Sequence, residues 1–378
     1  MKSVAKNNRL LSLDILRGIT VAGMILVNNG YGESFEMLRH SKWNGMTPCD
    51  LVFPFFLFIM GISCYLSLVK SAFKPTPQVL RRIVKRTVLL FAIGLFINWF
   101  DHAIEGDILC FAHLRVMAVM QRIALCYFFV SLFALYCNHR FTIPVVIGLL
   151  TVYAAILVFG NGYAYDADAN ILAQFDLRLL GYDHIYHKSP VDPEGLLGTI
   201  SSVAHVLLGF YCGLLIRQRE TVEQKVTAIF VFGTTLVIGG YLLSYGLPLN
   251  KRIWSPSYVL MTCGLASLLQ ALLMHVIDNN QGNQGDRSLD SEQNHGPVPL
   301  IPQTFFHVFG VNALALYVSS ELLAILLGNI GVSEWVYNGI HALIPAMKWA
   351  SLAYALYFVL LNFAIGYILY RKKIFIKL

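Results

Sequence analysis

Residues 51–71 read LVFPFFLFIMGISCYLSLVKS, and this stretch decides the fold class. It carries a single charged residue, Lys70, near its end. An α-helix needs about 20 mostly apolar residues to cross a hydrocarbon core roughly 30 Å thick. The whole chain is similarly apolar, since 57% of its 378 residues are hydrophobic, 13% are charged and the mean hydropathy is +0.62. This composition excludes an ordinary soluble domain and indicates a polytopic membrane protein.

About ten stretches of this kind occur along the chain. Lipid offers no partners to backbone amides, and the alternating pattern of a barrel strand is absent, so each stretch should be a helix. The predicted fold class is therefore all-α, a single transmembrane domain over 1–378. The predicted spans are 11–29, 51–71, 82–100, 116–137, 142–160, 198–216, 225–246, 256–277, 304–327 and 350–370.

The charges of the loops predict the orientation, because Lys and Arg accumulate on the cytoplasmic side of a membrane. Basic residues precede the first span, follow the last span and fill alternate loops, which places both termini in the cytoplasm. The loops between them are acidic or mixed and should lie outside. The formal charge of +7 is then explained by topology, so no nucleic-acid partner is expected and membrane lipid is the expected surroundings.

Two segments differ from the spans in composition. Residues 161–197 mix tyrosines, acids and two histidines, which suits either a folded cap over an external site or a solvated loop. Residues 279–300 are rich in Asn, Gln, Gly, Asp and Ser, which is typical of a disordered cytoplasmic linker. The seven cysteines are scattered without metal-ligand spacing, so no metal site is expected.

A short polar loop, Arg39-His40-Ser41-Lys42-Trp43-Asn44-Gly45, separates the first two spans and is followed by Asp50. Histidine titrates near neutral pH, and amides or carboxylates beside it can orient it or stabilise charge. The candidate catalytic residues are therefore His40, Asn28, Asn44 and Asp50, with Trp43 as a candidate substrate contact. The alternative is that the loop is merely solvated and that Asn28 ends the first helix.

Ionisable side chains inside spans cost about 2.5 to 3.5 kcal/mol at mid-helix, so each needs a partner or a role. Asp14 and Arg17 share one helical face and either satisfy each other or leave Arg17 for an anionic ligand from the cytoplasm. Arg122 has no acid at helical distance in its own span. Its planar donor fork must find a carboxylate elsewhere or a phosphate.

Three further groups of polar residues stand at or within spans. Asp192 and Glu194 suit the first turn of a helix, yet two outward carboxylates can also receive an ammonium or sugar hydroxyls. Asn312 inside the ninth span either joins helices or contacts ligand. The entry to the eighth span reads as interfacial aromatic and snorkelling residues or as ligand contacts: Asn250, Lys251, Trp254, Ser255 and Tyr258.

Taken in order, these motifs resemble the heparan-alpha-glucosaminide N-acetyltransferase family of membrane acyltransferases. The matching blocks run from about residue 10 to 315 and are specific as a set. They are Ser12-Leu13-Asp14-Ile15-Leu16-Arg17-Gly18, Val27-Asn28, His40, Trp43-Asn44-Gly45, Asp50-Leu51-Val52-Phe53-Pro54, Gln121-Arg122, Asp192-Pro193-Glu194-Gly195, Gly198-Thr199, Asn250-Lys251, Trp254-Ser255, Gly310 and Asn312.

The resemblance implies transfer of an acetyl group from cytosolic acetyl-CoA, across the membrane, to the amine of a glucosamine on the far side. It also implies that His40 is catalytic with Asn28 as its neighbour. The donor-binding candidates are then Arg17, Arg122, Asn250, Lys251, Trp254, Ser255, Tyr258 and Asn312. We expect a multi-pass protein of a bacterial inner membrane, and the family analogy allows a homodimer.

Two mechanisms fit these residues. Neutral His40 either attacks the thioester to form an acetyl-imidazole, or removes the ammonium proton while the amine attacks directly. The direct route is favoured because it needs no long-lived intermediate near water. The main alternative function is a secondary transporter of an amino sugar or small anion, although no inverted repeat is visible in the sequence.

Overall fold

The structure is a computed structural model that describes residues 10–278 and 303–376. In this part of the chain nine helices are long and apolar enough to cross a membrane, and a bent pair, α11 and α12, makes a tenth candidate span. The described residues contain no β-strand. The predicted all-α fold with about ten spans is confirmed.

The elements are α1 (Leu11–Asn28), η1 (Glu36–Leu38), η2 (Pro48–Leu51), α2 (Val52–Leu68), η3 (Val69–Ser71), α3 (Pro77–Ile104), η4 (Cys110–His113), α4 (Val119–Tyr136), η5 (His139–Phe141), α5 (Thr142–Phe159), α6 (Ile171–Leu180), η6 (Tyr182–His184), α7 (Gly198–Gln218), α8 (Val222–Leu243), α9 (Pro256–Leu273), η7 (Met274–Asp278), α11 (Gln303–Val311), α12 (Ala313–Asn329), α13 (Val332–Leu343) and α14 (Met347–Arg371).

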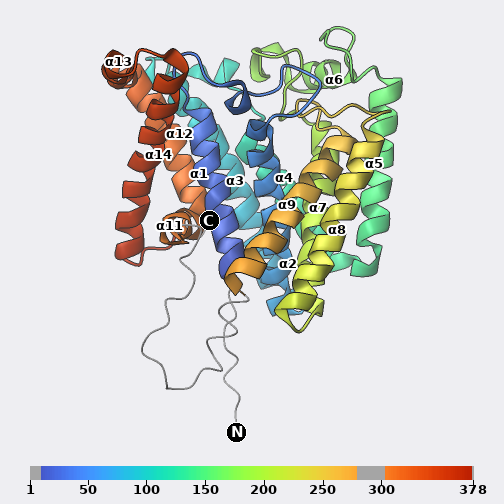
Figure 1. The fold of residues 1–378 in the computed structure, drawn as a ribbon. Coiled ribbons are helices and arrows are strands. Elements are labelled where there is room, and N and C mark those ends of the chain that lie inside the picture. The colour runs from blue at the N-terminus through green and yellow to red at the C-terminus, as the bar shows by residue number, and fades with distance from the viewer. Residues whose placement is uncertain (1–9, 279–302, 377–378) are drawn as a thin grey trace, which may run out of the picture.

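The long helices run up and down through one bundle, so successive loops alternate between its two ends (Figure 1). The upper end carries the loop after α1, the α6 segment and α13, and we call it the histidine end. The lower end carries the loops rich in Lys and Arg, and we call it the basic end. α1 begins and α14 ends at the basic end, as the sequence predicts. That this end faces the cytoplasm remains a prediction.

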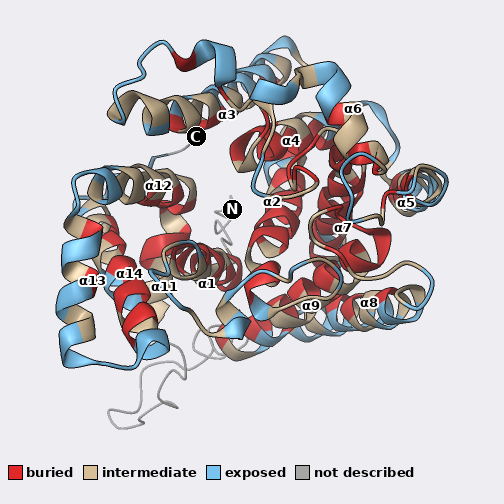
Figure 2. Ribbon diagram, turned by 90° about the horizontal axis from the view of Figure 1, so that it is seen from above, coloured by how far each residue is buried: buried red, intermediate tan, exposed pale blue. Residues whose placement is uncertain are grey.

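Burial separates central from peripheral helices (Figure 2). In α2 and α7, 72% of the most apolar window is buried inside the protein, against 17% in α3 and α8. α2 is apolar on all sides, which suits a helix surrounded by others, and it packs along α7. Peripheral helices leave large apolar side chains on the surface, as a lipid-facing helix must. The loops at the ends of α2 and α7 are therefore attached to the most buried helices of the bundle.

Local capping explains where several helices begin. Thr76 accepts a hydrogen bond from the amide of Val79, and Pro77 occupies the first turn of α3. Ser255 does the same for Tyr258 at the start of α9, again followed by a proline. These are standard N-terminal signals, because the cap satisfies an amide that has no partner within the helix.

The predicted span 304–327 is not one straight helix. α11 and α12 meet at Asn312 with a bend of 84°. The Asn312 side chain donates to the carbonyl of Ile374 at 3.0 Å and accepts from the amide of Ile376 at 2.9 Å. The buried amide thus bonds a segment beyond α14, a contact that periodicity along one span cannot reveal.

α1 and α11 cross with their backbones in contact. A β-carbon on Gly18 would lie 1.8 Å from the carbonyl oxygen of Phe306, and one on Gly310 would lie 1.9 Å from that of Asp14. Only glycine permits this approach, which is the usual use of small residues between membrane helices.

The two segments of unusual composition have different outcomes. Residues 161–197 contain α6 and η6, so the segment is structured at the histidine end. The predicted linker 279–300 lies outside the described residues. α13 is an additional short helix between two predicted spans, where the sequence predicted only an outward loop.

Candidate active site

The local sequence around Asp50 fixes its carboxylate. Thr47 and Pro48 start the short helix η2, and Asp50 reaches back so that its Oδ2 accepts the amide of Thr47 at 3.0 Å. The amide of Ser41 donates to the same oxygen at 3.1 Å. Asp50 is fully buried, so these bonds hold one oxygen in place and direct the other, Oδ1, toward the polar loop.

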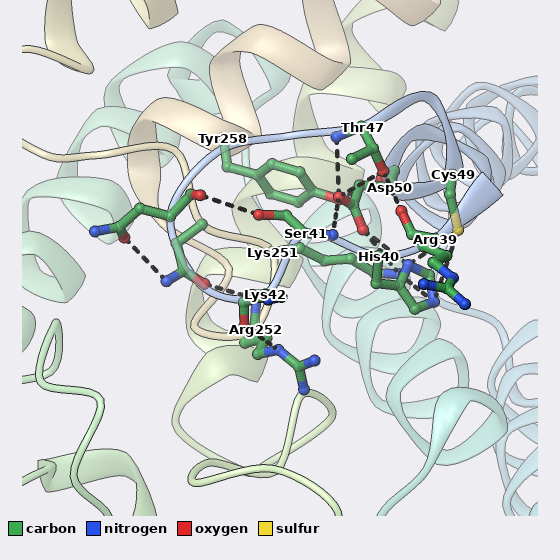
Figure 3. A network of polar contacts seen from close by, with 12 residues as sticks. Arg39, His40, Ser41, Lys42, Thr47, Cys49, Asp50, Lys251, Arg252 and Tyr258 are labelled. Atoms are coloured by element: carbon green, nitrogen blue, oxygen red, sulfur yellow. Dashed lines mark hydrogen bonds and ion pairs between the residues drawn. The ribbon is translucent and has the colours of Figure 1, made fainter. Parts of the chain in front are cut away.

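His40 receives that second oxygen. Its Nδ1 lies 2.8 Å from Oδ1 of Asp50 (Figure 3). A carboxylate in this position fixes the tautomer with the proton on Nδ1, which leaves a lone pair on Nε2. The His40 side chain is 45% exposed whereas Asp50 is not exposed at all. Buried Asp50 therefore fixes the orientation of an imidazole that is partly exposed.

Lys251 also contacts the imidazole, close to Asp50. Its Nζ is 3.0 Å from Nδ1 and 3.3 Å from Nε2 of His40, and 3.6 Å from Oδ1 of Asp50. Burial lowers the pKa of Lys251 below its usual value, although the nearby carboxylates of Asp50 and Glu194 act in the opposite direction. The Cys49 thiol also approaches the ring, with Sγ 3.1 Å from Nδ1.

A tight turn before α9 holds Lys251 in place. The side-chain oxygen of Asn250 accepts from the backbone amide of Arg252 at 2.8 Å, and the backbone amide of Asn250 donates to Ser255 Oγ at 3.0 Å. Trp254 adopts a positive φ of 52° and is 1% exposed. Tyr258 donates to the backbone carbonyl of Asp50. Trp254 and Tyr258 are fully buried, so their reading as interfacial belt residues is wrong.

The turn and the polar loop are joined directly. Three hydrogen bonds link them: Gly45 N to Leu249 O at 2.7 Å, Asn250 Nδ2 to Asn44 Oδ1 at 3.2 Å, and Arg252 Nε to Lys42 O at 3.1 Å. Trp43 Nε1 donates to the carbonyl of Tyr163 at 2.9 Å, which attaches the 161–197 segment to the same loop. Three distant parts of the sequence therefore meet at the loop that carries His40.

Asp192 and Glu194, two further candidates at the histidine end, share one cationic partner. Arg115 NH2 lies 2.7 Å from Oδ1 of Asp192 and 2.9 Å from Oε2 of Glu194. Asp192 also accepts the amide of Tyr186 at 3.1 Å. α7 begins only at Gly198, so the two acids form a turn before the helix and not its first turn. Their predicted substrate contact remains a prediction.

Arg17 is placed at a cavity nearer the basic end. It pairs with Asp14 at 2.9 Å, as its helical spacing predicts, and donates to Ser63 Oγ at 2.8 Å. The cavity, of about 320 Å³, is lined by a second arginine, Arg86, and by apolar side chains of α2 and α12. Ile376, whose amide donates to Asn312, also lines it. Two arginines beside an apolar cavity suit an anionic molecule with an apolar arm.

Arg122 is not at that cavity. It is 1% exposed, donates to the carbonyl of Gly195 at 2.8 Å, and lies over the Trp254 ring with 5.3 Å to the centroid. Asp176 lies in its electrostatic neighbourhood and accepts the amide of Leu196 at 3.0 Å. Burial raises the pKa of Asp176 to about 6, against the opposing effect of that hydrogen bond. Arg122 thus holds the base of the turn that carries Lys251.

Asn28 contacts a residue that sequence reasoning missed. α1 ends at Asn28, and its Nδ2 donates to Oε1 of Glu321 at 3.2 Å. Glu321 is the only acid in the predicted span 304–327. An ionisable side chain within a membrane span is energetically costly, and this cost is the signal by which Glu321 could have been identified from the sequence. Arg115, Cys49 and Arg86 were also missed, and their contacts arise only from the folded arrangement.

Comparison with known proteins agrees with the family resemblance that the motifs predict. Residues 9–186 match a family model described as heparan-alpha-glucosaminide N-acetyltransferase, catalytic. The heparan-alpha-glucosaminide N-acetyltransferase of Homo sapiens is 28% identical over 431 residues, covering 98% of this chain and 60% of the human protein. The protein of the same name from Mus musculus is 26% identical over 432 residues, covering 98% and 61%. The chain therefore spans about three fifths of the length of these curated relatives, and the predicted resemblance is confirmed.

Proposed function

Since the chain resembles the heparan-alpha-glucosaminide N-acetyltransferase family over nearly all its residues, we propose that it is a membrane acetyltransferase. It takes the acetyl group from acetyl-CoA at the basic end and delivers it to the amine of a glucosamine-type sugar at the histidine end. The single observation that carries this proposal is the 2.8 Å contact between Nδ1 of His40 and Oδ1 of Asp50. In this setting we place the basic end in the cytoplasm of a bacterial cell.

The proposed chemistry needs an oriented base at the acceptor side. Asp50 favours the His40 tautomer with its lone pair on Nε2, which lies 3.3 Å from Lys251 Nζ, and Nε2 accepts a proton from the sugar amine as the nitrogen attacks the thioester carbonyl. The carbon–sulfur bond then breaks and CoA leaves as the thiolate, which takes up a proton. In the alternative route Nε2 itself attacks, CoA leaves, and the amine captures the acetyl-imidazole. Lys251 supplies a cation beside either reacting carbonyl.

The donor is proposed to enter at the cavity beside Arg17 and Arg86. Arginine binds phosphate through paired donors, and the apolar lining suits the pantetheine arm. Arg17 and Asn28 are 11 positions apart on α1, which corresponds to roughly 16 Å along the helix at 1.5 Å per residue. The thioester end must cover about this distance among the helices to reach the histidine end.

The direct test is incubation of purified protein with radiolabelled acetyl-CoA and a panel of amino sugars. The expected result is labelled N-acetyl product with the unaltered chain and none above background with His40→Ala. Labelled product at an equal rate with His40→Ala would refute the assigned role. Electrophoresis of acid-quenched protein without acceptor distinguishes the two routes, because only the acetyl-imidazole route labels the protein.

A transporter of an amino sugar or small anion is the second candidate, and one observation favours it. The 84° break between α11 and α12 resembles the discontinuous helices that form binding sites in secondary transporters. Proteoliposomes distinguish the two functions. Counterflow of unmodified glucosamine without acetyl-CoA supports transport, whereas N-acetylglucosamine formed only with acetyl-CoA supports the enzyme.

A further inference from the structure

Glu321 is a carboxylate in α12 whose contacts within the protein are with neutral groups. Oε1 accepts from Asn28 Nδ2 at 3.2 Å, and the hydroxyl of Tyr317, one helical turn earlier, interacts with the same carboxylate. Within residues 10–278 and 303–376, no Lys, Arg or His forms an ion pair with it. An anion placed in a membrane helix without a cationic partner carries a substantial cost, so it requires a role.

The position of Glu321 connects it to the histidine site. Gly23 of α1 lies against Val52, since a β-carbon there would be 3.1 Å from Val52 Cγ1, and Val52 follows η2 directly. Asn28 is therefore a little more than one turn above the level at which α1 passes the Asp50 segment. Glu194 interacts electrostatically with both Lys251 and Tyr317, so it lies near both groups. Asn28 is exposed and Glu321 is half-buried, so a ligand can reach the pair.

The carboxylates of this region differ in whether a cation pairs with them. Asp50, Asp192 and Glu194 each have a cationic side chain within ion-pair distance. Lys251 lies against Asp50, and Arg115 binds both Asp192 and Glu194. Glu321 is left as the carboxylate for which the described side chains supply no cation.

We propose that Glu321 binds the ammonium group of the acceptor, with Asn28 and Tyr317 holding its carboxylate in position. The identity of this ligand as an amino sugar rests on the proposed function. Glu321 makes the site selective for the amine over the N-acetylated product, because acetylation removes the positive charge and the product leaves. It is a specificity-determining residue and neither forms nor breaks the acetyl bond.

The test measures binding without donor, using glucosamine and N-acetylglucosamine as the two probes in calorimetric titrations of the purified chain. The unaltered protein should prefer glucosamine by roughly tenfold or more, the effect of one charge-assisted hydrogen bond. Glu321→Gln should abolish this preference. Glu334→Gln, a matched change at an exposed carboxylate on α13, should preserve it. A preference retained in Glu321→Gln overturns the proposal.

Folding of each variant is checked by gel filtration and thermal melting. If Glu321→Gln does not fold, Glu321→Asp is the second variant, because it keeps the negative charge but moves the carboxylate away from the ligand. Glu321→Asp should weaken the binding of glucosamine more than that of N-acetylglucosamine. Equal weakening of both probes overturns the proposal. The acetylation assay separates this inference from the proposed function. If glucosamine binding depends on Glu321 but no acetylated product forms, the proposed acetyl transfer is refuted and the role of Glu321 stands. If product forms and Glu321→Gln leaves the KM for glucosamine unchanged, the role of Glu321 is refuted and the acetyl transfer stands.

Discussion

The ammonium nitrogen of Lys251 lies 3.0 Å from Nδ1 of His40, although 211 positions separate the two residues in the sequence. The turn before α9 delivers this lysine, and the loop before α2 delivers the histidine. Asp50 lies within reach of both, at 2.8 Å from His40 and 3.6 Å from Lys251. The site is therefore a charge network, and each member should have a separable effect on activity.

Lys251→Met should lower kcat of glucosamine acetylation by about 10- to 100-fold, because it removes the cation beside the reacting carbonyl. Lys251→Arg keeps a positive charge and should retain more activity than the methionine variant. Steady-state kinetics with both substrates varied provide the measurement. Equal activity of the methionine variant and the unaltered enzyme would show that the cation has no catalytic effect.

Asp50→Asn should lower kcat by about 10²- to 10⁴-fold, since the amide no longer favours the tautomer with its lone pair on Nε2. Binding of both substrates should change little, because Asp50 does not line the donor cavity and is not a hydrogen-bond partner of Glu321. The expected kinetic signature is a fall in kcat at nearly constant KM. A pure rise in KM would contradict the orienting role.

The two arginines within the spans, Arg17 and Arg122, should behave differently. Arg17→Gln should raise the KM for acetyl-CoA several-fold, because Arg17 lines the donor cavity. Arg122→Gln should leave that KM unchanged and lower the melting temperature, because Arg122 supports Gly195 and the Trp254 ring from a buried position. Arg82→Gln, at an exposed position on α3, is the control for loss of one charge near the basic end. A raised donor KM in Arg122→Gln would instead restore its predicted role as a phosphate ligand.

Asp176 should make stability depend on pH. Its pKa is raised to about 6 in the folded protein from 3.8, so the folded state binds more protons than the unfolded state between these values. The stability that this group contributes is complete below about pH 4 and is lost as the pH rises through 6. Asp176→Asn should therefore gain stability relative to the unaltered chain as the pH increases from 4 to 7, by at most about 3 kcal/mol.

The measurement is the melting temperature of purified protein across this pH range. Asp168→Asn changes an exposed carboxylate of the same segment and should show no such trend. A difference between Asp176→Asn and the unaltered chain that stays constant with pH would contradict the shift.

Gly310→Ala should destabilise the protein by roughly 1 to 3 kcal/mol, because a β-carbon would meet the carbonyl of Asp14 and force α1 and α11 apart. Gly148→Ala is the control, since a β-carbon on this α5 residue meets nothing within 4 Å. Melting temperatures of the two variants give the comparison. Equal stability would mean that the crossing adjusts without cost.

Sequence reasoning predicted the spans because length and apolarity are local properties. It selected His40 and Asp50 because ionisable groups in a short loop between spans need an explanation. The pairing of Asp14 with Arg17 was also predictable, since residues three positions apart share a helical face.

Sequence reasoning failed where tertiary packing decides. The burial of Trp254 and the approach of Lys251 to His40 depend on how the loop before α2 meets the turn before α9. The break at Asn312 depends on the backbone of residues 374–376, more than 60 positions away. Glu321 was overlooked although its type and place in a span were visible in the sequence.

The segment after α14 contributes to the shape of the donor cavity. Asn312 forms hydrogen bonds with the backbone of Ile374 and Ile376, and the side chain of Ile376 is part of the cavity wall. A few residues with no helix around them close one side of a space otherwise walled by the bundle. Loss of these two hydrogen bonds should therefore change the cavity wall at Ile376 while the transmembrane helices keep their packing.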